Sequence, residues 1–125
     1  MPSIKKVAVI GSGVMGSGIA AQAANAGLEV FLLDIVAEGS DRDAVARNAI
    51  QRMSKTNPAP LMHARNAKRI QPGNLDDHLD WLAGCDLVIE AVLENLEIKK
   101  NLYQKVDAHR RSDCIVTSNT STIPL

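Results

Sequence analysis

Residues 7–16 read VAVIGSGVMG, and a second apolar run at residues 28–34 reads LEVFLLD. Gly11 permits a tight turn after the first strand, Gly13 lets the backbone approach a pyrophosphate, and Gly16 lets the following helix pack close to the strand. Phosphates bind at such a helix N-terminus because its unpaired N–H groups and its dipole favour anions. The order of strand, glycine turn, helix, strand and acid predicts a dinucleotide pocket. A turn with a purely structural purpose is the alternative. The residues of this turn expected to contact the cofactor are Gly11, Ser12, Gly13, Val14, Met15 and Gly16.

Asp34 stands at the end of the second apolar run and bears on the choice of cofactor. A carboxylate at this point accepts hydrogen bonds from the adenosine ribose hydroxyls and repels a 2′-phosphate. Residues 35–37, Ile-Val-Ala, supply no Arg or Lys that would hold such a phosphate. The sequence therefore favours NAD over NADP, although an acid at a strand end also caps loops.

Length and composition limit the number of domains and the kinds of partner that the chain is expected to have. The chain has 125 residues, enough for one domain with a real core, and its 14 Lys and Arg balance its 14 Asp and Glu. This balance gives no reason to expect nucleic acid or an anionic membrane as a partner. No apolar run approaches the ~20 residues that cross a bilayer, and no signal peptide precedes the first strand, so we expect a cytoplasmic protein. Cys85 and Cys114 lack metal-binding spacing and are expected to be buried thiols, so no metal site is expected.

Hydrophobic periodicity predicts an alternation of strands and helices. The expected strands cover residues 5–10, 29–33, 85–92 and 114–118, with a short one at 69–71 followed by a turn at 72–74. The expected helices cover residues 14–26, 42–54, 61–67, 76–83 and 95–111. This pattern indicates an α/β fold, a Rossmann-type doubly wound parallel sheet with a helical hairpin inserted at about residues 42–68.

Two polar loops follow later strands of this sheet, at residues 90–95 and 118–122. Ligands of open α/β sheets bind outside the carboxyl ends of the strands, so both loops are expected to share one crevice with the glycine turn. Each loop also has a structural explanation. Glu94 and Asn95 are favoured at the start of a helix, and the Ser- and Thr-rich segment forms turns readily.

Three segments resemble the NAD-binding half of 3-hydroxyacyl-CoA dehydrogenases: GSGVMGSGIA at residues 11–20, DLVIEAVLENLEIKK at 86–100 and SNTST at 118–122. The segment NPAPLM at residues 57–62 is similar to bacterial members and to multidomain fatty-acid oxidation proteins. The resemblance implies oxidation of L-3-hydroxyacyl-CoA to 3-ketoacyl-CoA by hydride transfer to NAD. It also implies that Glu94 and Lys99 contact the nicotinamide side, that Ser121 lies beside the nicotinamide and the substrate hydroxyl, and that Asp34 holds the adenosine ribose.

The general base of that family is a His downstream of the SNTS loop, and this chain ends at Leu125, before such a segment. His63, His78 and His109 do not match the motif and are expected to be solvated. The helical catalytic and dimerisation domain of the family is likewise expected to be missing. We therefore expect a truncated chain, spanning residues 1–125 of an NAD-binding domain, that binds cofactor without turnover and self-associates through uncovered apolar surface.

A charge pattern between residues 44 and 75 favours an acyl-CoA substrate. This segment contains no acid and six bases, namely Arg47, Arg52, Lys55, Arg65, Lys68 and Arg69. Such a hairpin attracts the phosphates of CoA, with Lys55 as the candidate contact, although a solvated helical face is the alternative.

Two other functions remain open from the sequence. A β-hydroxyacid dehydrogenase of the 3-hydroxyisobutyrate type shares the glycine start but typically lacks the long hairpin. A non-catalytic NAD-binding or structural relative retains the fold without the chemistry.

Overall fold

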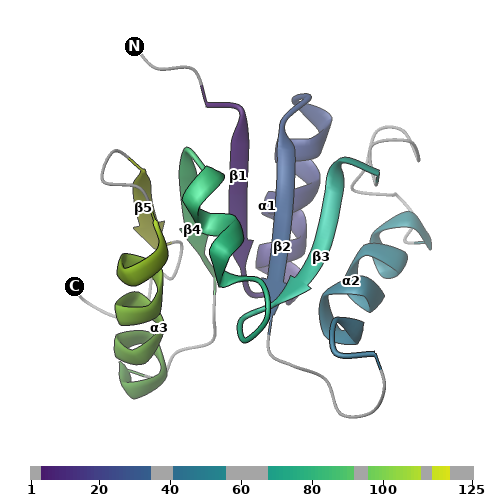
Figure 1. The fold of residues 1–125 in the computed structure, drawn as a ribbon. Coiled ribbons are helices and arrows are strands. Elements are labelled where there is room, and N and C mark those ends of the chain that lie inside the picture. Colours follow the sequence, from purple (N-terminus) through teal and green to yellow (C-terminus); the bar gives the residue numbers. More distant parts are fainter. Residues whose placement is uncertain (1–3, 35–40, 56–67, 92–95, 111–113, 119–125) are drawn as a thin grey trace.

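A twisted sheet of five parallel strands forms the centre of the protein, in the order β3-β2-β1-β4-β5 (Figure 1). The computed structural model describes residues 4–34, 41–55, 68–91, 96–110 and 114–118. The strands are β1 (Lys6–Ile10), β2 (Glu29–Asp34), β3 (Ile70–Asn74), β4 (Leu87–Glu90) and β5 (Ile115–Ser118). The helices are α1 (Val14–Asn25), α2 (Ala44–Lys55) and α3 (Leu96–His109), with a 3₁₀ helix, η2 (Leu79–Gly84).

The register of the sheet brings the ends of neighbouring strands level with one another. In the three-strand centre Ile10 pairs with Leu33 of β2 and with Glu90 of β4, and Asp34 pairs with Asn74 of β3. All carboxyl ends therefore meet along one edge, the lower edge in Figure 1. This parallel, doubly wound arrangement confirms the predicted fold class.

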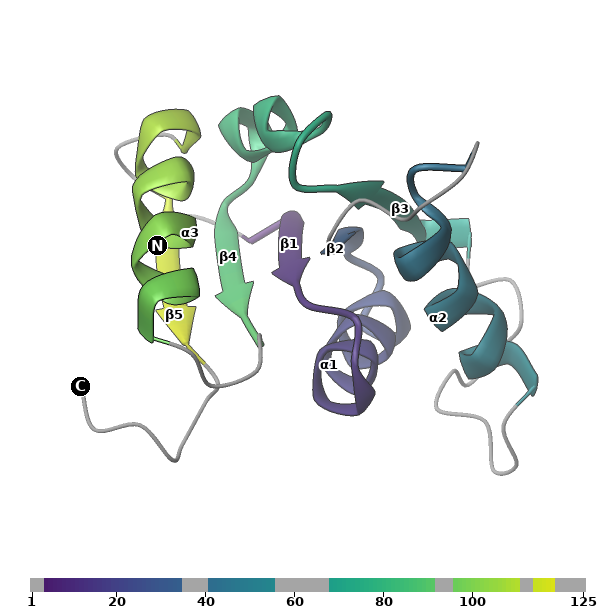
Figure 2. The same ribbon diagram turned by 90° about the horizontal axis from the view of Figure 1, so that it is seen from below.

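Two helical layers cover the sheet, one on each face (Figure 2). On one face α1 and α2 pack against β1, β2 and β3, while on the other α3 and η2 pack against the alternate side chains of the strands. The α1 surface is built from small residues, with Ala20, Ala21 and Ala24 fully buried. Small side chains bring this helix close to the strands, because they leave little volume between the two backbones.

Most described elements lie where the sequence predicts them, within two residues at either end, and the exceptions are β3 and η2. The helix α1 ends in a Schellman motif, in which Gly27 donates to the Ala24 carbonyl and Leu28 donates to the Ala23 carbonyl. Two predictions were wrong. Residues 72–74 continue β3 instead of forming a turn, and the helix expected at residues 76–83 is the shorter 3₁₀ helix η2.

The inserted hairpin is described only in part. Its first helix is α2, whose buried side chains include Ala46 and Ala49. The second helix expected at residues 61–67 lies outside the described residues. Both cysteines are buried thiols, as predicted. In the part of the chain that is described, no helix has the length and apolar character needed to span a membrane.

Candidate functional site

The strand order reverses between β1 and β4, and this switch point defines the candidate site. From β1 the chain proceeds to β2 and β3 on one side, and then crosses to β4 and β5 on the other. The carboxyl ends of β1 and β4 are joined by a hydrogen bond of 2.8 Å from the Ala91 N–H to the Ile10 carbonyl. Crevices at such switch points bind the ligands of open α/β sheets.

The glycine turn at this point depends on glycine at two positions. Gly11 has a φ of 103°, in the left-handed region that side chains disfavour. A Cβ on Gly16 would lie only 1.8 Å from the Gly11 carbonyl oxygen and 3.6 Å from the Cβ of Ala91. The start of α1 therefore packs directly against the turn, as the sequence predicts for the third glycine of the motif.

The N-terminus of α1 is open towards solvent. Its N-cap is Gly13, which provides no side-chain hydrogen bond to the first-turn N–H groups, and a Cβ at Gly13 would meet no atom within 4 Å. The Met15 side chain in the same turn is 52% exposed. The first N–H groups of an α-helix have no partner within the helix. Such donors at an exposed helix start are what a pyrophosphate requires, so the turn fits a dinucleotide.

Asp34 is held by the glycine turn. Its Oδ2 accepts a hydrogen bond of 2.7 Å from the Ser12 backbone N–H and a second hydrogen bond from the Ser12 hydroxyl. Asp34 is half-buried, and Ser12 is 2% exposed. The structure thus brings together two of the predicted site residues, and no sequence motif predicts the bond between them.

Glu90 has a different environment from the one the sequence suggests. It is the last residue of β4 and is almost fully buried, and its Oε1 accepts a hydrogen bond of 3.3 Å from the Tyr103 hydroxyl of α3. The beginning of the polar segment at residues 90–95 therefore links β4 to α3 instead of facing a ligand.

A polar network around the buried Asn74 lies next to Asp34 at the end of β3. The Asn74 amide donates to Asp43 Oδ1 at 2.7 Å and to Asp77 Oδ2 at 3.0 Å, and its Oδ1 accepts from the Asp77 N–H at 2.7 Å. The Arg42 guanidinium donates to both Asp77 oxygens, at 2.6 and 3.1 Å. These bonds, first that from Arg42 and then that from Asn74, lower the pKa of Asp77. The network ties α2 to the sheet.

The prediction that His78 is solvated was wrong. Its Nδ1 accepts a hydrogen bond of 2.9 Å from the Asn74 N–H, and its ring lies 4.2 Å from that of Trp81. It is therefore a packed structural residue, whereas His109 is exposed as predicted. His63 lies outside the described residues.

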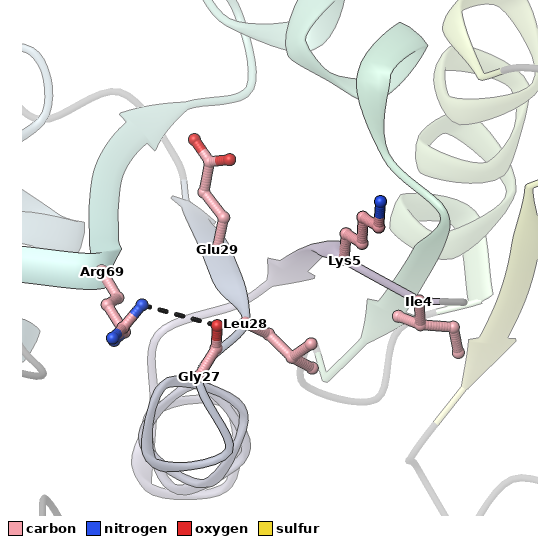
Figure 3. A pocket seen from close by; sticks show the side chains of 6 residues that line it. All are labelled: Ile4, Lys5, Gly27, Leu28, Glu29 and Arg69. Atoms are coloured by element: carbon pink, nitrogen blue, oxygen red, sulfur yellow. Dashed lines mark hydrogen bonds between the residues drawn. The ribbon is translucent and has the colours of Figure 1, made fainter.

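A hollow of about 460 Å³ lies at the opposite edge of the sheet (Figure 3). It is lined by Ile4, Lys5, Gly27, Leu28, Glu29 and Arg69. Since these residues surround the amino ends of β1 and β2, the hollow is not the crevice expected for a dinucleotide.

Two bases of the predicted CoA-binding segment have other partners. Arg69 lines this hollow, and its guanidinium lies 3.5 Å from the Gly27 carbonyl oxygen. Arg47 forms an ion pair of 2.8 Å with Asp41. These two residues therefore give no support to a basic surface for CoA at the carboxyl edge.

The other predicted contacts are described partly or not at all. Glu94 and Ser121 lie outside the described residues, as do most residues of both polar loops. For Val14, Lys55 and Lys99 the structure describes the backbone alone, within α1, α2 and α3. The roles of these five residues stay predictions.

Comparisons with known proteins point to one family. Residues 6–125 match the profile described as 3-hydroxyacyl-CoA dehydrogenase, NAD binding domain. A probable 3-hydroxyacyl-CoA dehydrogenase of Bacillus subtilis is 47% identical over 96% of the chain, and a putative fatty acid oxidation complex trifunctional enzyme of Rickettsia felis is 49% identical over 98%. The crystal structure of 3-hydroxybutyryl-CoA dehydrogenase from Escherichia coli superposes with a TM-score of 0.77, at 38% identity, over 98% of this chain and 26% of that one.

The matched region is a small part of the relatives. The chain spans 17% of the length of both the Bacillus and the Rickettsia proteins. The similarity therefore concerns one domain, and it favours the hydroxyacyl-CoA dehydrogenases over a β-hydroxyacid dehydrogenase of the 3-hydroxyisobutyrate type.

Proposed function

The chain belongs to the 3-hydroxyacyl-CoA dehydrogenase family and contains its NAD-binding domain, and from this premise we propose how it holds NAD and which reaction it serves. The turn of residues 11–16 binds the pyrophosphate through the N–H groups at the start of α1. Asp34 binds the adenosine ribose and disfavours a 2′-phosphate. The observation that carries this proposal is the position of the Asp34 carboxylate, fixed by Ser12 beside the open N-terminus of α1.

The reaction that we propose for the protein is oxidation of a 3-hydroxyacyl-CoA to the 3-ketoacyl-CoA. NAD supplies the hydride acceptor when bound. The family resemblance assigns Glu94 and Lys99 to the nicotinamide side of the cofactor, and Ser121 to the nicotinamide and the substrate hydroxyl. Lys55 is the candidate contact to the phosphates of CoA. A homo-oligomer and a cytoplasmic location remain predictions from the sequence.

Titration of the chain with NADH and NADPH, followed by nucleotide fluorescence, tests the cofactor site. We expect saturable NADH binding that is tighter than NADPH binding. Asp34→Ala is expected to weaken NADH binding about tenfold or more, because hydrogen bonds to a charged group are lost, and to remove the preference for NADH. Asp107→Ala is the matched control, since it removes one acid with a side chain 66% exposed near the end of α3. This control is expected to bind both nucleotides like the wild type.

Two results would contradict the proposal. A wild-type chain that binds neither nucleotide lacks the proposed pocket. An Asp34→Ala variant that retains the preference shows that the discrimination comes from another residue. The reaction itself is tested on the longer protein that contains this domain, by the appearance of NADH absorbance when a 3-hydroxyacyl-CoA and NAD are added.

A further inference from the structure

The Ser12 hydroxyl is placed for a task that the glycine motif does not require. The motif needs glycine at Gly11 and Gly13, but the residue between them contributes its backbone whatever its side chain. Here that side chain is a hydroxyl that donates to Asp34 Oδ2, the same oxygen that accepts the Ser12 N–H at 2.7 Å. One carboxylate oxygen is thus bound twice by one residue.

The backbone around this bond is fixed from both sides. The Gly11 N–H donates to the Leu33 carbonyl at 2.8 Å, which joins the turn to β2. The Leu75 N–H donates to the Asp34 carbonyl at 2.9 Å, which joins Asp34 to the chain after β3. These backbone bonds leave the Asp34 side chain able to rotate. The two hydrogen bonds from Ser12 restrict this rotation.

The burial of Ser12 indicates that its hydroxyl acts through Asp34. The residue is 2% exposed, and its own carbonyl accepts a hydrogen bond of 2.8 Å from the Ser17 hydroxyl. A buried hydroxyl that donates its hydrogen bond to a carboxylate is poorly placed to bind a ligand that arrives from solvent. Holding the carboxylate in one orientation before the ligand binds lowers the entropic cost of binding.

We propose that Ser12 is a positioning residue for cofactor discrimination, whose hydroxyl orients the Asp34 carboxylate towards the ribose of NAD. The inference rests on the proposed function of Asp34 as the ribose-binding acid. It separates two contributions of the site. The charge of Asp34 excludes a 2′-phosphate, whereas the orientation set by Ser12 provides affinity for the ribose hydroxyls.

A double-mutant cycle tests the inference in this chain. The wild type, Ser12→Ala, Asp34→Ala and the double variant are titrated with NADH and with NADPH, and thermal unfolding verifies that each is folded. Ser12→Ala keeps the backbone donor and the charge of Asp34, so we expect NADH binding to weaken about five- to tenfold while NADPH binding stays unchanged. In the Asp34→Ala background the same substitution is expected to change NADH binding less than twofold.

Ser17→Ala is the matched control, because it removes a nearby hydroxyl, at the start of α1, that donates to the Ser12 carbonyl and not to Asp34. We expect it to leave the ratio of NADH to NADPH affinity unchanged. If Ser12→Ala does not fold, Ser12→Gly removes the same hydroxyl and replaces it in the cycle.

The outcomes separate the two proposals. An equal loss of NADH affinity in both backgrounds overturns the inference, because the hydroxyl would then act independently of Asp34. A loss shared equally by NADH and NADPH, or no loss at all in a wild type that binds NADH, overturns it as well. A wild-type chain that binds neither nucleotide overturns the proposed function, and the inference fails with it.

Discussion

Replacing Gly16 with alanine is expected to damage both the stability of the chain and its cofactor site. The added Cβ would lie 1.8 Å from the Gly11 carbonyl oxygen, so the turn and α1 must separate by about 1.2 Å to reach even the shortest tolerated contact. α1 resists this movement because Ala20, Ala21 and Ala24 are fully buried in the core. We expect a loss of about 2–3 kcal/mol, the usual cost of overpacking. For a chain of this size that lowers the melting temperature by about 10 °C.

Gly18→Ala is the matched control two residues further along the same helix. A Cβ there meets no atom within 4 Å, and alanine is the better helix former by about 0.5–1 kcal/mol. The two variants are therefore expected to shift the melting temperature, followed by circular dichroism, in opposite directions. NADH affinity is expected to fall at least about tenfold in Gly16→Ala, as the N–H groups of the turn move, and to stay unchanged in Gly18→Ala. A Gly16→Ala chain that melts at or above the wild-type temperature would refute the reasoning.

Two further predictions concern the network at the end of β3. Asn74→Ala is expected to lower the free energy of unfolding, measured in urea, by about 2–4 kcal/mol, because the hydrogen bonds of a buried amide to charged groups are lost. Gln71→Ala replaces an exposed residue of the same strand and is expected to change this free energy by less than about 0.5 kcal/mol. Equal urea midpoints for the two variants would contradict the prediction. Arg42→Gln removes the main cause of the lowered pKa of Asp77. A carboxylate whose pKa is lower in the folded chain than its unfolded value of 3.8 stabilises the fold at pH values above 3.8, and this stabilisation is lost as the pH falls through the folded-state pKa. Melting temperatures of wild type and Arg42→Gln are therefore expected to differ at neutral pH and to converge in acid, and a gap that widens in acid would show the opposite linkage.

The parts of the site that are local in sequence could be predicted from it. Gly11, Gly16 and Asp34 are identified by residue type and spacing, because a strand, a tight turn and a helix impose these requirements within a few residues. The Ser12 bond to Asp34 spans 22 residues. It depends on the register that places Ile10 beside Leu33, and no pattern along the chain encodes that register.

The error at residues 72–74 has a physical cause. Pro72 and Gly73 are turn residues in most contexts. Among the described strands, however, β3 pairs with β2 alone and lies at the edge of the sheet, where a missing N–H is tolerated. A Cβ on Gly73 would come within 2.7 Å of both Leu33 and Trp81. Glycine is therefore present here because side chains from β2 and η2 close over it, and tertiary packing of this kind leaves no local signal.

The support of the candidate site extends beyond the glycine turn to the edge strand. Asp34 pairs with Asn74, and its carbonyl accepts the Leu75 N–H, so the backbone of the acid that we propose to bind the ribose is fixed by the residues that the Asn74 network holds in place. Asn74→Ala is thus expected to weaken NADH binding as well as to destabilise the chain. Its effect on NADH affinity should be smaller than that of Asp34→Ala, because the Ser12 bonds to the carboxylate remain, while Gln71→Ala should leave NADH affinity unchanged.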